Sequence, residues 1–135
     1  MKKFLDAQAN DYEQALNEIR AGHKHSHWIW YIFPQLKDLG RSSIAVHYGI
    51  RDLAEAKEYL AEPTLRARLI EISAALLQLP GNDPLVVMGH PDEQKLWSCM
   101  TLFAEADPEC AVFQQVLDKY YGGVPDPKTL ELLQK

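Results

Sequence analysis

Residues 22–35 read GHKHSHWIWYIFPQ, and the interpretation of the fold depends on this stretch. Every residue from Trp28 to Phe33 is apolar or aromatic, so neither the alternation of a strand nor the period of a surface helix is visible. The residue types suit a strand, but Ser26 can also cap a short helix that Pro34 limits. We interpret the segment as a helix. Because a helix that is apolar all round must be enclosed by its neighbours, we expect it at the centre of the fold.

The remainder of the chain predicts an all-α fold of about six helices. Residues 10–13 and 52–55 resemble capping boxes, and Asp92 suits the N-cap of a further helix. Residues 85–88, which read LVVM, are interpreted as a short strand or a buried turn. The expected helices cover roughly residues 10–22, 52–60, 63–79, 92–103, 112–121 and 126–133.

Length and composition indicate a single globular domain over residues 1–135. A chain with 47% hydrophobic and 24% charged residues can bury a sizeable core without metal or disulfide crosslinks. Two cysteines without paired spacing, and no apolar segment after the initial MKKF, indicate a cytoplasmic protein with reduced thiols. The net charge of -5 argues against general nucleic-acid binding, and no apolar run is long enough for a membrane span.

The alternation of His23, His25 and His27 suggests a metal site, because an extended chain would place all three imidazoles on one face. A zinc site needs a further ligand and partners for its histidines. No spaced ligand pair elsewhere in the chain completes such a site. We therefore interpret the histidines as a polar entry to the apolar segment, and we expect neither a metal nor a cofactor.

A second group of residues depends on the segment being helical from near Lys24. Lys24, His27 and Tyr31 would then project to one side, beside Trp28 and Trp30. The lysine would meet a phosphate or carboxylate, a tryptophan could stack on a flat ring, and His27 could act as a general acid or base. In the alternative interpretation the aromatic residues fill the core and Lys24 reaches to water.

The expected helix at residues 92–103 carries a polar edge. Lys95 and Ser98 lie beside its apolar stripe, and spacing alone favours a solvated helix edge for them. Cys99 falls within the stripe and is interpreted as a small hydrophobic residue. Residues 40–43, GRSS, could touch a phosphate at a helix start, although helix capping explains them equally well.

Two blocks of the chain resemble the hallmark of a bacterial family known as domain of unknown function 1810. They are Gly22-x-Lys24-x-Ser26-His27-Trp28-x-Trp30-x-Ile32-Phe33-Pro34-Gln35 and Lys95-Leu96-x-Ser98-x-Met100-Thr101-Leu102-Phe103. The resemblance extends over nearly the whole chain. It implies a small, cytosolic, mainly helical protein whose activity is not established. Some members carry the name calpastatin, but that inhibitor resembles a disordered polar chain, whereas this sequence encodes a core.

The resemblance also implies a site built from both blocks, since polar residues kept within apolar segments need partners or a ligand. His27 and Asp92 are the expected catalytic residues, with His27 as the acid or base and Asp92 orienting a partner. The expected ligand-binding residues are Lys24, Trp28, Trp30, Gln35, Lys95, Ser98 and Thr101.

Three functional hypotheses follow. In the first, a polar pocket beside Trp28 and Trp30 binds a small anionic, nucleotide-like metabolite, and a hydrolytic step extends that hypothesis. In the second, partly exposed tryptophans make the protein a non-enzymatic interaction module. In the third, the polar residues form a purely structural network. The hypotheses differ in whether the polar residues of the two blocks converge on one cavity.

Overall fold

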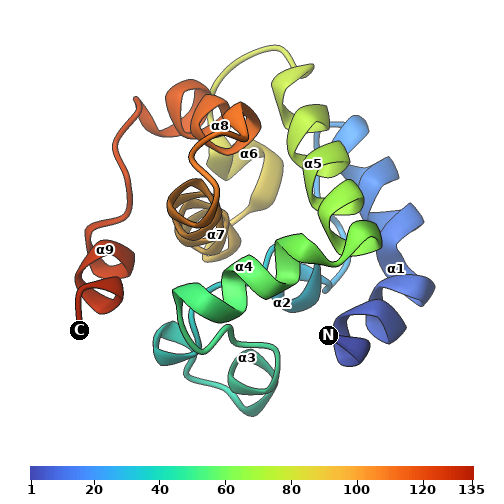
Figure 1. Cartoon of the computed structure of the whole chain (residues 1–135). Helices are drawn as coiled ribbons and strands as arrows, with labels where there is room; N and C mark the ends of the chain where they lie inside the picture. The colour runs from blue at the N-terminus through green and yellow to red at the C-terminus, as the bar shows by residue number, and fades with distance from the viewer.

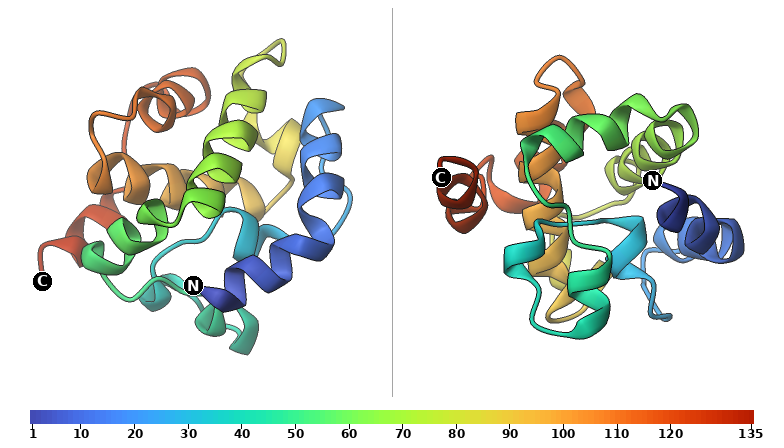
Figure 2. Two further views of the ribbon diagram at one scale, coloured as in Figure 1. Left: turned by 45° about the vertical axis from the view of Figure 1, so that its right-hand side comes forward. Right: turned by 60° about the horizontal axis from the view of Figure 1, so that its bottom comes forward.

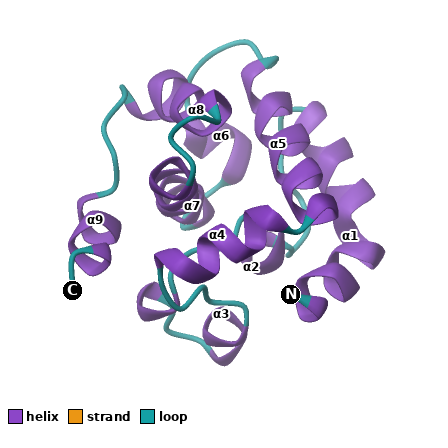
Figure 3. Ribbon diagram, viewed as in Figure 1, coloured by secondary structure: helices purple, strands orange, loops and turns teal.

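The computed structural model describes all 135 residues and contains nine α-helices, one 3-10 helix and no strand, which confirms the all-α prediction (Figure 1, Figure 3). In all views α1 and α9 lie on opposite sides of the molecule (Figure 2). No helix is both long enough and apolar enough to cross a bilayer. The elements are α1 (Lys2–Arg20), α2 (Ile29–Ile32), η1 (Lys37–Leu39), α3 (Ser43–His47), α4 (Leu53–Ala61), α5 (Pro63–Leu77), α6 (Pro84–Met88), α7 (Asp92–Ala106), α8 (Ala111–Tyr121) and α9 (Pro127–Leu133).

The other helices pack around α7. Its residues from Ser98 to Phe103 are all buried, so the helix is enclosed on every side along this stretch. The helices α4, α6, α8 and α9 contact it, and Figure 1 views it nearly along its axis. Beyond this centre, α5 packs on α8 and α1 packs on α5. One hydrophobic cluster of 31 buried residues joins these elements.

The aromatic segment is helical and buried, as predicted. It forms a single turn, α2, which packs on α1. The flanking residues Trp28 and Phe33 are each 1% exposed, and only Trp30 of the six residues is partly accessible. Ser26 does not cap the turn, which begins without any side-chain cap. Because so short a helix has little stability of its own, burial holds it in place.

The predicted helix start at residues 10–13 is wrong. The helix α1 begins with the second residue of the chain and passes through these positions without a break. Phe4 and Gln8 extend its buried face towards the N-terminus, and this burial outweighs the capping pattern. The side-chain amide of Gln8 donates to the Tyr31 carbonyl at 2.7 Å and to the Tyr59 hydroxyl at 2.9 Å. Gln8 thus fixes α1 to α2 and α4 in the interior.

Residues 85–88 form neither a strand nor a turn but most of the short helix α6. Asp83 caps this helix by accepting a hydrogen bond from the N–H of Leu85 at 2.9 Å, and Pro84 occupies its first position. The helices α2, α3 and α6 have only four or five residues each. That length is too short for a helical period to be visible, so α3 and α6 were not predicted as helices, and α2 was predicted only because its apolar residues indicate an enclosed helix.

The remaining predicted boundaries divide into one error and two confirmations. Asp92 is the first residue of α7 rather than its cap, because its carboxylate is used in an ion pair. Asp52 caps α4 as predicted, accepting from the N–H of Glu55 at 2.9 Å. Gly122 ends α8 in the left-handed conformation, so the helix stops at Tyr121, where the expected helix over residues 112–121 also stops.

Residues 36–50 form a loop that is closed at its own base. A parallel bridge joins Leu36 to Ile50, and the N–H of Lys37 donates to the Ile50 carbonyl at 2.8 Å. The elements η1 and α3 lie within this loop and pack on each other. A Cβ atom at Gly49 would lie 2.4 Å from the Lys37 Cα, so the close crossing at the base requires glycine. We call this segment the 36–50 loop.

Candidate functional site

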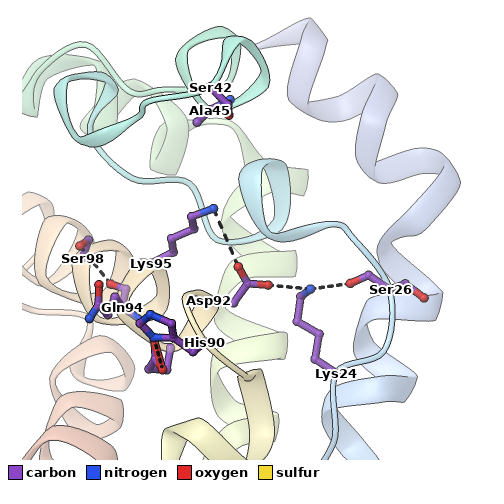
Figure 4. Close-up of polar contacts among 10 residues, drawn as sticks. Lys24, Ser26, Ser42, Ala45, His90, Asp92, Gln94, Lys95 and Ser98 are labelled. Atoms are coloured by element: carbon purple, nitrogen blue, oxygen red, sulfur yellow. Dashed lines mark hydrogen bonds and ion pairs between the residues drawn. The ribbon is translucent and has the colours of Figure 1, made fainter.

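Two lysines from distant parts of the chain meet at one aspartate (Figure 4). Lys24 Nζ lies 2.8 Å from Asp92 Oδ2, and Lys95 Nζ lies 3.9 Å from Asp92 Oδ1. Lys24 belongs to the loop before α2, whereas Asp92 and Lys95 belong to the first turn of α7. The structure therefore brings the two sequence blocks together. We call these three residues the lysine–aspartate cluster, and two ammonium groups with one carboxylate leave it one net positive charge.

Lys24 has no capacity left for a ligand. Its side chain is 5% exposed, and its ammonium donates to the carbonyl of Ser26 as well as to Asp92. The ring of Trp28 lies 4.8 Å from Nζ and adds a cation–π contact. Two acceptors and one aromatic face account for the three N–H donors of a lysine. Lys24 therefore serves to hold the loop before α2 against α7.

Glu18 of α1 holds the same loop from the other side. Its carboxylate accepts from the N–H groups of His25 at 2.8 Å and Ser26 at 2.9 Å, from the Ser26 hydroxyl at 2.7 Å and from the Trp28 indole at 3.1 Å. Burial alone would raise the pKa of Glu18, but these hydrogen bonds outweigh it and lower the pKa to about 2. The sequence analysis missed Glu18, because the path of a loop and not a motif brings these donors together.

The predicted common face of Lys24, His27 and Tyr31 is wrong, because the loop before α2 is not helical. The Tyr31 hydroxyl instead donates to the carboxylate of Asp11 in α1. His27 is exposed, and no hydrogen bond or ion pair joins its imidazole to the lysine–aspartate cluster. The geometry thus gives His27 no partner for acid–base chemistry.

The alternating histidines are not gathered around a common point. The rings of His23 and His25 pack edge to face with centroids 4.7 Å apart, and His23 Nδ1 lies 3.1 Å from the Val86 carbonyl. No group of three His, Cys, Asp or Glu side chains is arranged to hold a metal ion. Cys99 packs in the core, as predicted, and burial raises the pKa of its thiol.

Ser98 and Thr101 both bond to Asp126, Ser98 to its buried carboxylate and Thr101 to its backbone N–H. Asp126 precedes α9 and is 6% exposed. The hydroxyls of Ser98 and Thr129 donate to its Oδ2 atom at 2.8 Å and 2.7 Å. The backbone N–H of Asp126 donates to the Thr101 hydroxyl oxygen at 2.9 Å. These hydrogen bonds fasten α9 to α7, so both residues have a structural role.

A polar groove of about 970 Å³ lies between the 36–50 loop, the start of α7 and α9. Its size is within the range of small-molecule sites. Three of the residues expected to bind a ligand line it: Gln35, Lys95 and Ser98. Arg41, from the GRSS stretch that could touch a phosphate, also lines it, and so do Gln94, Trp97 and Lys128, which were not expected. The helical spacing of positions 91, 94, 95 and 98 marks one face of α7 and could have indicated Gln94.

Lys95 is the member of the lysine–aspartate cluster that lines the groove. Its side chain is 25% exposed, and its distance from Asp92 is that of an ion pair without a hydrogen bond. The ring of Trp30 lies 5.6 Å from Nζ and helps to position it. No hydrogen bond within the protein uses the Lys95 ammonium, and if the Trp30 ring takes one N–H donor, as the Trp28 ring does at Lys24, two remain available to a ligand.

The family model described as "Protein of unknown function (DUF1810)" matches residues 1–133. The chain belongs to this family. A crystal structure of the conserved hypothetical protein Rv1873 from Mycobacterium tuberculosis is 45% identical and matches with a TM-score of 0.97. The match covers 99% of this chain and 96% of that chain. No match is found among curated proteins. The DUF1810 family predicted from the two sequence blocks is thus confirmed.

In this DUF1810 chain the two tryptophans of the first block do not form an exposed aromatic surface. Trp28 is buried and its indole N–H is held by Glu18, while Trp30 is only partly accessible. The accessible polar groups lie instead along the groove on the second block. The candidate site is therefore the groove, with the loop of the first block as its support.

Proposed function

We propose that the groove binds a small anionic ligand and that Lys95 contacts the anion. The observation that carries this proposal is the net positive charge of the lysine–aspartate cluster. Asp92 is shared between two lysines, so it cannot neutralise both. Because Lys24 is saturated, the excess charge is available at Lys95, on the wall of the groove.

The neutral and basic groups around Lys95 support the same ligand class. The carboxamides of Gln35 and Gln94 line the groove, and each offers N–H donors and a carbonyl acceptor. Arg41 and Lys128 add cations from the 36–50 loop and from α9. A phosphate or carboxylate would be held by charge-assisted hydrogen bonds from such groups.

The proposal concerns binding and includes no chemical step. Asp92, expected to be catalytic, acts as a positioning residue because it anchors both lysines. His27 makes no hydrogen bond or ion pair with the cluster, and Ser98 is hydrogen bonded to Asp126. A hydrolytic activity would need an acid–base group that the geometry does not supply at Lys95.

The proposal is tested by titrating inorganic phosphate and ribose 5-phosphate into the wild-type protein and the Lys95→Gln variant in a calorimeter. Lys57→Gln is a matched control, because Lys57 is exposed on α4 and makes no ion pair. We expect Lys95→Gln to weaken binding about tenfold, since charged hydrogen bonds contribute about 1.5–3 kcal/mol. Lys57→Gln should leave the affinity unchanged. Equal affinities in all three proteins, or no binding to the wild type, would overturn the proposal.

A further inference from the structure

We infer that the ligand of the groove is a nucleoside monophosphate, with its base on Trp97 and its phosphate at Lys95. This inference rests on the proposed function and specifies the ligand of the same site. It assigns the aromatic platform to Trp97, which occupies the unspecified position between Leu96 and Ser98 in the second block. Four features of the groove support it: the rigid Trp97, the spacing of the anchors, two amides without a partner and the charge of the lining.

Trp97 is fixed as a flat platform in the wall of the groove. Its indole N–H donates to the carbonyl of Val124 at 2.7 Å. Its ring stacks on Tyr121 with centroids 5.8 Å apart and planes 14° from parallel. The Tyr121 hydroxyl in turn donates to the carbonyl of Glu93 at 2.6 Å. A ring held in this way loses little further freedom when a base stacks on it.

The positions of Lys95 and Trp97 on α7 require a ligand with two separated ends. Successive helical residues are about 100° apart, so these two lie on opposite flanks of the line formed by Gln94 and Ser98. All four residues line the groove. A ligand that reaches both flanks must span about the width of a helix, roughly 10 Å. A base joined to a phosphate through a ribose can do so, whereas inorganic phosphate or a sugar phosphate reaches only one anchor.

The amide of Gln94 lies between these two anchors, and neither its side chain nor that of Gln35 has a hydrogen-bond partner within the protein. Carboxamides can donate to and accept from the edge of a base or the hydroxyls of a ribose. The groove therefore offers a stacking surface, two amides without a hydrogen-bond partner and one ammonium without a hydrogen bond in the protein. Nucleotide recognition combines these three kinds of contact.

The charge of the lining limits the number of phosphates. Equal numbers of basic and acidic side chains line the groove: Arg41, Lys95 and Lys128 against Asp38, Asp126 and Glu131. The protein as a whole carries a net charge of -5. At neutral pH a phosphate monoester carries about 1.5–2 negative charges. It therefore leaves less negative charge unmatched by the one excess positive charge of the lysine–aspartate cluster than a triphosphate does. We therefore assign the monophosphate.

The test measures dissociation constants for AMP, GMP, CMP, UMP, ATP and ribose 5-phosphate with the wild-type protein. At least one monophosphate should bind about tenfold more tightly than ribose 5-phosphate, since base stacking on an aromatic residue contributes about that much. Trp97→Leu should remove this advantage without changing the affinity for ribose 5-phosphate. Trp97→Phe should retain most of it, and serves as the measurement if Trp97→Leu does not fold.

The outcomes separate this inference from the proposed function. If every monophosphate binds no better than ribose 5-phosphate, and Lys95→Gln weakens them all, the anion site stands and the nucleotide assignment is wrong. An unchanged monophosphate preference in folded Trp97→Leu also overturns the assignment. If ATP binds more tightly than the best monophosphate, the assignment of a ligand with a single phosphate is wrong. If none of these compounds binds, the proposed function itself fails.

Discussion

Lys24 Nζ lies 2.8 Å from Asp92 Oδ2, and both side chains are largely withdrawn from solvent at this contact. The ion pair joins the loop before α2 to the first turn of the central helix α7. It also sets the orientation of Asp92, whose second oxygen faces Lys95. The Lys24–Asp92 ion pair thus has two effects. It packs the loop before α2 against α7, and it leaves the charge of Lys95 only partly neutralised beside the groove.

Removing either partner of this pair should destabilise the protein strongly. Asp92→Ala would leave the Lys24 ammonium buried without its carboxylate, and Lys24→Met would leave the carboxylate without its ammonium. Loss of one partner of a buried pair costs about 3 kcal/mol or more. We expect each variant to lower the free energy of unfolding by about that amount, measured by urea denaturation.

The double variant Lys24→Met/Asp92→Ala provides the internal control. Because no unpaired charge remains at the contact, its loss should be smaller than the sum of the single losses by about 1–3 kcal/mol. Additive losses would mean that the two side chains act independently. In that case the ion pair would not link the loop to α7.

Glu18 should make stability depend on acidic pH. Its pKa is lowered from an ordinary 4.5 to about 2 in the folded protein, so its stabilising contribution is complete above about pH 4.5. The contribution is lost as the pH falls towards 2. Glu18→Gln should therefore lower the free energy of unfolding at pH 7 by about 2 kcal/mol, and this difference from wild type should shrink by pH 2.5.

Urea denaturation at both pH values measures this difference. Glu13→Gln is the matched control, because Glu13 is exposed on the same helix and makes no hydrogen bond or ion pair. It should change the free energy of unfolding by less than about 0.5 kcal/mol. A Glu18→Gln difference that stays constant with pH would contradict the assigned role of the carboxylate.

Ser98 should contribute to stability through Asp126. Ser98→Ala removes a donor from a buried carboxylate, and we expect the free energy of unfolding to fall by about 1–3 kcal/mol. Hydrogen exchange in α9 should quicken, since that helix is fastened to α7 through Asp126. Ser43→Ala, at an exposed residue of α3, should leave both quantities unchanged. If Ser98→Ala is as stable as the wild type, the structural role of Ser98 is contradicted, and Ser98 is again a candidate ligand-binding residue.

His27→Ala should have little effect on folding, because the imidazole is exposed and makes no hydrogen bond. We expect a change in the free energy of unfolding of less than about 0.5 kcal/mol, measured by urea denaturation. Phosphate affinity should also be unchanged, since His27 does not contact the lysine–aspartate cluster. A clear loss of affinity in the folded variant would restore His27 to the site.

The fold could be predicted where the sequence carries a long period. The helix α5 presents Leu65, Leu69, Ile72 and Leu76 on one buried face. A stripe of this length indicates a helix whatever the neighbouring elements are. The short helices α3 and α6 could not be predicted. The helix α6, for example, has fewer than one and a half turns and depends on the burial of Val87 and Met88. The capping pattern at residues 10–13 led to a wrong helix start for a related reason. The local preference for a cap there was outweighed by the burial of Phe4 and Gln8, which extends α1 towards the N-terminus.

The site could be predicted only in part. Lys24, Asp92 and Lys95 were expected to act together, and the structure places them in one cluster. That Lys24 is saturated and Lys95 is not could not be foreseen, since it depends on which carbonyl and which ring each ammonium meets. The role of Trp97 could not be predicted from the sequence either, because its ring is held in place by stacking on Tyr121 of α8.

The closed base formed by Leu36 and Ile50 has a consequence for how this family can diverge. The chain enters and leaves the 36–50 loop at nearly the same point, so a longer or shorter excursion would leave α2 and α4 where they are. Insertions or deletions in the 36–50 loop can thus change one wall of the groove without changing the hydrophobic core. Family members could in this way differ in the ligand that the groove prefers while the helices around α7 keep the same arrangement.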